Sequence, residues 1–200
     1  MRKLGVILFI LGLVNVSAAA VIGFDDLTTP NTGSGMANWG LVPASYQGLT
    51  WTGFEVLNGD GPGSNYMNVY GNSYGPTSST NFAYNGDDGY LVTLVSSTLF
   101  DFIGADFTSF AQNNAYQGFS AQSLTLIGKL GTNVLYTLPV SLSPSSFNTV
   151  LANFIGIDTL VIQSESAGKY WGMDNFTTPE PTTICLLGLG ALGLLRKRRG

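Results

Sequence analysis

Residues 123–142, SLTLIGKLGTNVLYTLPVSL, decide the fold class of this chain. Two runs in which apolar and polar side chains alternate, Ser123 to Leu130 and Asn133 to Val140, flank the pair Gly131-Thr132. Alternation with a period of two is typical of β-strands that bury one face. A two-residue connection that starts with glycine fits a type II′ turn, which joins antiparallel strands. The segment therefore predicts a β-hairpin.

Short strand-like runs recur on both sides of this hairpin, with turn residues between them, and they favour an all-β sandwich. Only Ser146 to Phe154 fits a turn or two of helix. The Gly-, Asn- and Ser-rich stretch from Asn58 to Gly89 predicts long loops around brief strands, and such loops commonly carry binding sites. The remaining strands are predicted at Val21 to Phe24, Gly48 to Leu57, Tyr66 to Tyr70, Gly89 to Val95, Phe100 to Phe107, Thr159 to Ser164 and Tyr170 to Thr177.

The two ends of the chain differ from its middle and divide it into three parts. Residues 1–20 are predicted as a signal peptide, 21–178 as the β-sandwich domain, and 179–200 as an apolar tail with a basic end. The middle part holds eleven Asp and Glu residues against Lys129 and Lys169, a net charge of −9. Nothing in it would neutralise phosphates, so the charge excludes nucleic acid as a partner.

Cysteine and histidine usage excludes several kinds of chemistry. The chain has no histidine, and its single cysteine, Cys185, lies in the apolar tail. The predicted domain can therefore hold no disulfide and no Ser-His-Asp or Cys-His catalytic group. Zinc sites that rely on His or Cys clusters are excluded for the same reason.

The N-terminus has the three parts of a secretion signal. Arg2 and Lys3 precede an apolar run, and small residues follow it at Ser17 to Ala20. Ala18 and Ala20 have the Ala-x-Ala spacing of a cleavage site, so cleavage is predicted after Ala20. An uncleaved anchor is the alternative, but the apolar run is short for a hydrocarbon core of about 30 Å.

The C-terminus combines three elements in a fixed order. Pro179, Glu180 and Pro181 hold the chain extended and accessible to a processing enzyme. The apolar run Thr182 to Leu195 would form a helix of about 21 Å, marginal for crossing a bilayer. Four basic residues then favour the cytoplasmic side, and these are Arg196, Lys197, Arg198 and Arg199.

Together these elements, PEPTTICLLGLGALGLLRKRR, resemble the PEP-CTERM sorting signal. The resemblance implies that an exosortase, a membrane-embedded cysteine transpeptidase-like enzyme, recognises the tail and processes it near Pro-Glu-Pro. It also implies export through the secretion machinery, transient anchoring in the inner membrane, and delivery to the bacterial surface or the exopolysaccharide matrix. A plain C-terminal membrane anchor is the alternative.

The middle of the chain resembles the jelly-roll sandwich domains found ahead of such tails, which are similar to carbohydrate-binding modules. The resemblance rests on VIGFDDL, GLTWTGFEV, LFDFIGADFTSF, the hairpin segment, and GIDTLVIQS with YWGMDNFT. It implies a jelly-roll fold and an activity in binding rather than catalysis.

Acidic residues near the first and last strands predict a structural calcium site. The first and last strands of a jelly roll commonly lie side by side, which would bring Asp25 and Asp26 close to Asp174 and Asn175. Carboxylate and amide oxygens are the ligands that Ca²⁺ selects, and the resemblance implies a calcium ion at this kind of place. The alternative is that these acids cap turns or face solvent. Asp60, Asp87 and Asp88 offer a second set, more typical of turns.

Tyrosines in the loop-rich segment predict a glycan surface, because aromatic rings stack on the C–H faces of sugars. The candidates are Tyr66, Tyr70, Tyr74 and Tyr84, whereas Trp51 and Trp171 are predicted to lie in the core. A glycoside hydrolase would need two carboxylates across a cleft, for which Glu55, Asp101, Asp106 and Glu165 are available.

The sequence thus predicts a non-catalytic exported protein of the cell surface or exopolysaccharide matrix, which binds glycan through a calcium-stabilised sandwich. A structural or adhesive coat protein that binds protein partners is the first alternative. A weak glycoside hydrolase is the second.

Overall fold

The computed structural model describes residues 19–33, 36–59, 65–86, 89–112 and 114–179. Within these, Val21–Thr178 forms one compact unit that is almost entirely β-structure. The prediction of an all-β fold is therefore confirmed. The signal peptide before Ala19, the tail after Pro179, and the loop acids Asp60, Asp87 and Asp88 lie outside the described residues.

Twelve strands and two short helices form the regular structure of the described part of the chain, and ten pairs of strands in it run antiparallel. The elements are β1 (Ala19–Ile22), β2 (Asn31–Gly33), β3 (Met36–Leu41), β4 (Ser45–Tyr46), β5 (Leu49–Thr52), β6 (Glu55–Asn58), α2 (Tyr66–Tyr70), β7 (Asn81–Tyr84), β8 (Leu91–Ser109), α3 (Asn114–Gln117), β9 (Ser123–Leu130), β10 (Asn133–Ser141), β11 (Asn148–Ser164) and β12 (Trp171–Pro179).

Two long strands, β8 and β11, organise the sandwich. They pair with each other along most of their lengths, and the register shifts between Leu151 and Thr159. Asn153 and Gly156 have positive φ of 52° and 66° there, as expected where bulges bend a strand. The first half of β8 also pairs with β5 and its second half with β12. The bent pair therefore belongs to both layers.

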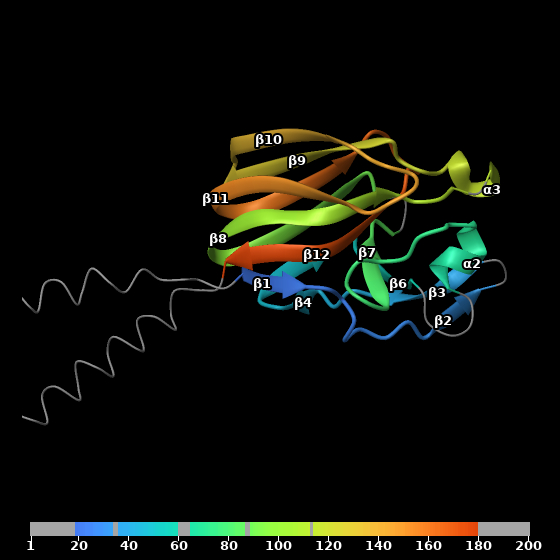
Figure 1. The fold of residues 1–200 in the computed structure, drawn as a ribbon. Coiled ribbons are helices and arrows are strands. Elements are labelled where there is room, and N and C mark those ends of the chain that lie inside the picture. The colour runs from blue at the N-terminus through green and yellow to red at the C-terminus, as the bar shows by residue number, and fades with distance from the viewer. Residues whose placement is uncertain (1–18, 34–35, 60–64, 87–88, 113, 180–200) are drawn as a thin grey trace, which may run out of the picture. The chain divides into compact units, whose positions relative to one another are not determined.

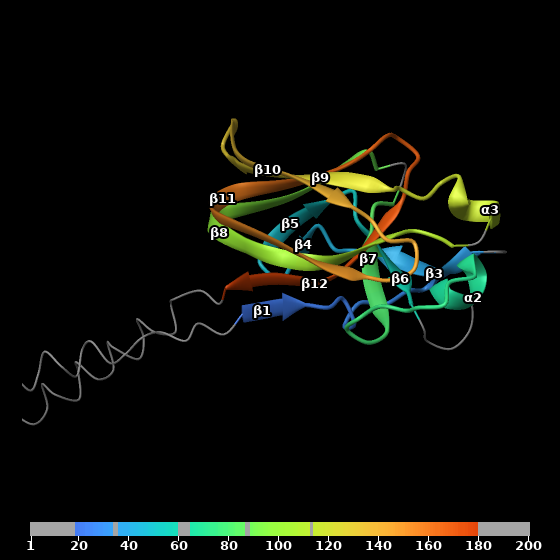
Figure 2. The same cartoon turned by 45° about the horizontal axis from the view of Figure 1, so that its top comes forward.

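Strand order follows from this bend. One layer continues from β11 to β9 and β10, and the other runs from β8 through β12, β7, β6 and β3 to β2, with β1 beside β12. Figures 1 and 2 both show β9, β10 and β11 on one side, and β1, β3 and β6 on the other. In both views β1 and the end of β12 lie at one end of the unit, and α2 and α3 lie at the opposite end.

The main core lies between the layers and is rich in aromatic rings. Trp51 is 3% exposed and Trp171 is fully buried, so the prediction that both lie in the core is confirmed. Trp51 packs edge-on against Phe176, with ring centroids 5.5 Å apart, and Phe176 stacks on Phe102 at 4.8 Å. Because β12 contributes both Trp171 and Phe176, this strand is anchored in the core along its length.

The predicted hairpin is confirmed in detail. Strands β9 and β10 pair from Leu130 and Asn133 outward, with an irregularity near Val134. Gly131 has φ of 57°, whereas Thr132 does not have positive φ, as a type II′ turn requires. The carboxylate of Asp158 accepts a hydrogen bond from the Gly131 amide at 2.7 Å.

Several predicted elements are wrong in type or in extent. Tyr66–Tyr70 is the helix α2, because the Asn65 side chain caps it through the Asn68 amide at 2.8 Å and Gly71 ends it in a left-handed conformation. Ser146 to Phe154 is not helical, since pairing with β8 makes Asn148 onward part of β11. The two strands predicted at 89–95 and 100–107 are one, β8.

A second, smaller aromatic cluster lies beside α2. Tyr66 is fully buried, and its hydroxyl donates to the carbonyl oxygens of Ser109, at 3.3 Å, and Phe110. Its ring packs edge-on against Phe82 at 4.7 Å. Burial raises the pKa of Tyr66 well above its usual range and the pKa of Tyr70 to about 12.

These shifts predict alkaline unfolding. Unfolded tyrosine ionises at about pH 10, so the stabilisation from the raised folded-state pKa values is complete below that pH and is lost as the pH rises, for Tyr70 between about pH 10 and 12. The chain has no histidine, so little change is expected near neutrality. Urea midpoints against pH, with tyrosinate absorbance, test this. Ionisation of all tyrosines at about pH 10 with the fold intact would contradict it.

Candidate functional site

A pocket of about 580 Å³ is lined by residues of β3, α2, β7 and α3, among others. One wall is formed by Met36 and Trp39 of β3. Tyr70, the last residue of α2, and Tyr84, the last residue of β7, also line it and are only 4% and 7% exposed. These two tyrosines therefore line its inner part.

The other wall comes from segments far away in the sequence. Phe110 follows β8, Tyr116 lies in α3, Phe119 follows α3, and Tyr170 precedes β12. Tyr70 packs edge-on against Tyr116, with centroids 4.9 Å apart, and Phe110 lies 5.5 Å from Tyr170. Phe119 is 54% exposed. The result is a nearly continuous aromatic lining with an exposed ring at its rim.

One carboxylate, Glu55 of β6, faces this aromatic lining among the described residues. It accepts a hydrogen bond from the Tyr84 hydroxyl. Burial and Glu55 raise the pKa of Tyr84 far above its usual range, so Tyr84 stays a donor. A Cβ on Gly86 would lie 2.3 Å from the Glu55 Cδ, which shows that the backbone at Gly86 packs directly on the carboxyl group.

An aromatic pocket with a fixed carboxylate can bind a ligand that has apolar faces and polar hydrogens. Its volume lies within the range of about 300–1,000 Å³ that small-molecule sites occupy. Aromatic rings contact the C–H faces, and carboxylate oxygens accept from hydroxyl or ammonium groups. No Lys or Arg occurs among the described residues that line the pocket.

Two of the four predicted glycan tyrosines, Tyr70 and Tyr84, line this pocket. The expectation that these tyrosines lie at the surface is wrong for Tyr66, whose ring the capped helix α2 turns into the core, and Tyr70 and Tyr84 are also buried. Tyr74 is half-buried, and its hydroxyl lies 2.8 Å from the Thr108 hydroxyl and donates to Ser109 O at 3.1 Å. No local sequence pattern marks Phe110, Phe119 or Met36 as pocket residues, because they come from segments far apart in the chain.

The predicted calcium ligand Asp174 has its oxygens occupied by protein donors. It is fully buried, and its Oδ2 accepts from the amides of Thr77, at 2.8 Å, and Ser78, at 2.6 Å. Its Oδ1 accepts from the Asn175 amide at 2.8 Å. Burial raises the pKa of Asp174, and this effect outweighs the hydrogen bonds that lower it.

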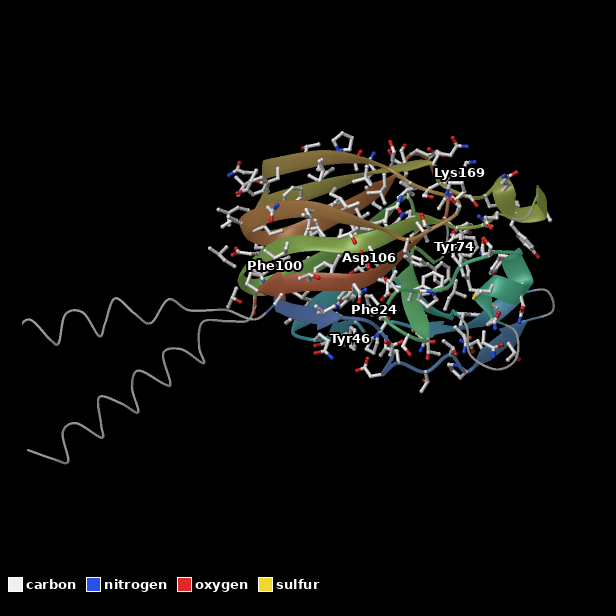
Figure 3. The ribbon with its side chains drawn as sticks, viewed as in Figure 1. Phe24, Tyr46, Tyr74, Phe100, Asp106 and Lys169 are labelled. Atoms are coloured by element: carbon white, nitrogen blue, oxygen red, sulfur yellow. The ribbon has the colours of Figure 1, made fainter. Side chains whose placement is uncertain are left out.

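Asn175 and the neighbouring Asp106 extend this network. Asn175 has a positive φ of 49° at a β-bulge, and its side-chain amide donates to Asp106 Oδ2 at 2.9 Å. Asp106 also accepts from the hydroxyls of Thr149, at 2.6 Å, and Thr77, at 2.7 Å. Burial alone would raise the pKa of Asp106, but these three hydrogen bonds together lower it. Figure 3 places Asp106 on β8, close to β12.

The other two predicted ligands belong to different contacts. Asp25 Oδ1 accepts from the amides of Thr80, at 2.7 Å, and Asn81, at 2.9 Å. Asp26 Oδ1 accepts from the Tyr46 hydroxyl at 2.5 Å, and Figure 3 shows Tyr46 near Phe24. Asp25 and Asp174 therefore fasten the two ends of one loop, residues 77–81, to the sandwich.

These residues do not fit a calcium ion as they stand. The carboxylate oxygens of Asp174 and Asp25 face N–H and O–H donors, whereas Ca²⁺ needs several oxygens that face a common point. Among the described residues, no group of three or more acidic, His or Cys side chains converges. Calcium binding stays a prediction.

The carboxylates considered for hydrolysis do not line one pocket. Glu55 lines the aromatic pocket, Asp101 accepts from the Gly156 amide at 2.7 Å, and Glu165 accepts from the Ser123 hydroxyl at 3.3 Å. Asp106 belongs to the network with Thr77 and Asn175. Of these four, only Glu55 lines the aromatic pocket.

Comparison with known families identifies the C-terminal segment. Residues 177–199 match the PEP-CTERM protein-sorting motif, which confirms the resemblance drawn from the sequence. No curated protein matches the chain. The match covers Pro179 together with Glu180, Pro181 and the basic residues 196–199, which lie outside the described residues.

The fold and the motif together define a class: this is an exported β-sandwich protein with a C-terminal sorting signal. More particularly, it is a substrate of the exosortase and the secretion machinery. No helix within the described ranges has the length and apolar character needed to cross a membrane. Of the predicted cleavage residues, Ala18 is not described, and Ala20 lies in β1.

Proposed function

We propose that this protein is a non-catalytic component of the bacterial surface or exopolysaccharide matrix, and that it binds glycan in the aromatic pocket. The observation that carries the proposal is the lining itself: seven aromatic side chains and the Glu55 carboxylate around about 580 Å³. Sugar rings present apolar C–H faces and polar hydroxyls in alternation, and this lining offers a partner for each.

The position of the pocket supports a role at a surface. The compact unit begins at Val21 in β1 and ends at Thr178 in β12, and these two strands are paired. β1 and the end of β12 lie at the end of the unit opposite α2 and α3 (Figures 1 and 2), and both helices contribute residues to the pocket lining. A chain held by the segment after β12 would thus leave the pocket accessible to an extracellular polymer.

A rim variant tests the proposal. Phe119→Ala removes a ring that is 54% exposed and lines the pocket, so stability should change little. We expect glycan affinity to fall about tenfold, which is about 1.4 kcal/mol. A glycan array on the purified full-length protein, with titration of the glycans that bind, measures this.

Leu99→Ala is the matched control, because Leu99 is 61% exposed and is not among the pocket residues. It should bind as the unchanged protein does. If no polysaccharide binds, including that of the producing cell, or if both variants lose affinity equally, the pocket is not a glycan site. An adhesive coat protein would then be the better description. A hydrolase would instead release product, and Glu55→Gln would abolish the release.

A further inference from the structure

The chemistry of the pocket distinguishes between kinds of sugar. Glu55 brings a negative charge to a lining in which the other eight residues are seven aromatic side chains and Met36. It is 9% exposed, and because burial disfavours an unpaired charge, a cationic ligand that pairs with the carboxylate would offset that cost. Aromatic ring faces are themselves partly negative and attract cations such as ammonium groups.

The geometry keeps the carboxylate fixed. The Tyr84 hydroxyl donates a hydrogen bond to it, and the backbone at Gly86 packs closely against it. The carboxylate would repel an anionic group of a ligand, and no Lys or Arg of the described lining would offset that repulsion. A ligand that placed an ammonium group here would gain both a charge-assisted hydrogen bond and contact with the rings.

The domain around the pocket is also negatively charged. Residues 21–178 carry a net charge of −9 and contain only two lysines. One of these, Lys169, donates from Nζ to the carbonyl oxygen of Gly118 at 2.6 Å and is not among the lining residues. Its charge opposes that of a bound cation, so its removal should strengthen cation binding.

From these observations we infer that the pocket binds an amino sugar with a free, protonated amine, as a unit of a polysaccharide, in preference to a neutral or acetylated sugar. This inference rests on the proposed glycan binding and names its ligand class. The Glu55 carboxylate pairs with the ammonium group, and the surrounding rings, including Trp39 and Tyr70, contact the sugar ring.

Three oligosaccharides of equal length and linkage test the inference: β-1,4-linked glucosamine, its N-acetylated form, and the corresponding glucan. They differ only at carbon 2. Titration of the full-length protein should show at least tenfold tighter binding of the glucosamine oligomer, weakening as salt rises. Glu55→Gln should reduce this preference to about threefold or less. Lys169→Gln should strengthen glucosamine binding severalfold.

Glu165→Gln is the matched control, because it removes one negative charge at an exposed site outside the pocket. It should keep the full preference. If Glu55→Gln does not fold, the titration of the three oligomers on the unchanged protein and the salt dependence of that binding decide the inference. If the acetylated or neutral oligomer binds equally well, the inference fails while glycan binding stands. If tetramethylammonium binds and no sugar does, the proposed glycan binding and the preference for an amino sugar both fail.

Discussion

Alanine at Gly104 should destabilise the protein by about 3 kcal/mol, because the new methyl group would meet backbone rather than a movable side chain. Gly104 lies in the second half of β8, paired with Leu151 of β11 and Thr177 of β12. A Cβ there would lie 2.2 Å from the Val150 carbonyl oxygen. The strands would have to separate where the two layers share them.

Urea denaturation measures this loss as a lower midpoint with an unchanged slope. Gly118→Ala is the matched control, since nothing lies within 4 Å of its added Cβ and its φ is ordinary. Its stability should stay within about 0.5 kcal/mol of that of the unchanged protein. Similar midpoints for the two variants would mean that β8 and β11 are not held as closely as described.

Asn in place of Asp174 should cost about 3 kcal/mol, because an amide cannot accept hydrogen bonds on both sides. Asp174 Oδ2 accepts hydrogen bonds from the Thr77 and Ser78 amides, and Oδ1 accepts one from the Asn175 amide. Whichever way the new amide turns, its NH₂ group faces a backbone N–H in a fully buried place. The loop 77–81 should then detach at that end.

The same variant tests the calcium prediction when melting temperatures are recorded with calcium and with a chelator. If Asp174 only anchors the loop 77–81, the variant should melt at the same lower temperature with calcium and with chelator. The chelator should then have no effect on the unchanged protein. A ligand role predicts that the chelator lowers the melting temperature of the unchanged protein and leaves the variant unaffected, since an ion bound only by the folded state stabilises it. Glu165→Gln, an exposed charge change, should match the unchanged protein.

The sequence predicted those parts of the fold that local pattern determines. The hairpin of β9 and β10 carries its own alternation and its own turn residue, Gly131, so its register needed no distant partner. By contrast, Asn148 to Phe154 is strand only because β8 lies beside it. A run of five residues such as Tyr66–Tyr70 fits strand and helix equally, and the cap at Asn65 decided between them.

The candidate site was less predictable for a related reason. The prediction that the first and last strands are neighbours is confirmed, since β1 pairs with β12. The loop 77–81, however, brings its amides to Asp25 and Asp174, and no feature of its sequence marks that contact. The pocket likewise joins residues from Met36 to Tyr170, and only the folded chain brings them together.

The strand by which the compact unit ends also determines how the protein would carry a mechanical load. β12 pairs with β8, β7 and β1, and it contributes Trp171 and Phe176 to the core. If the pocket binds a polymer as proposed, a pull on that polymer that is resisted at Thr178 would load β12. The ladder beside β8 would then be sheared, so its hydrogen bonds would resist together rather than open one after another. Attachment through the end of β12 would therefore suit a protein that is held under tension.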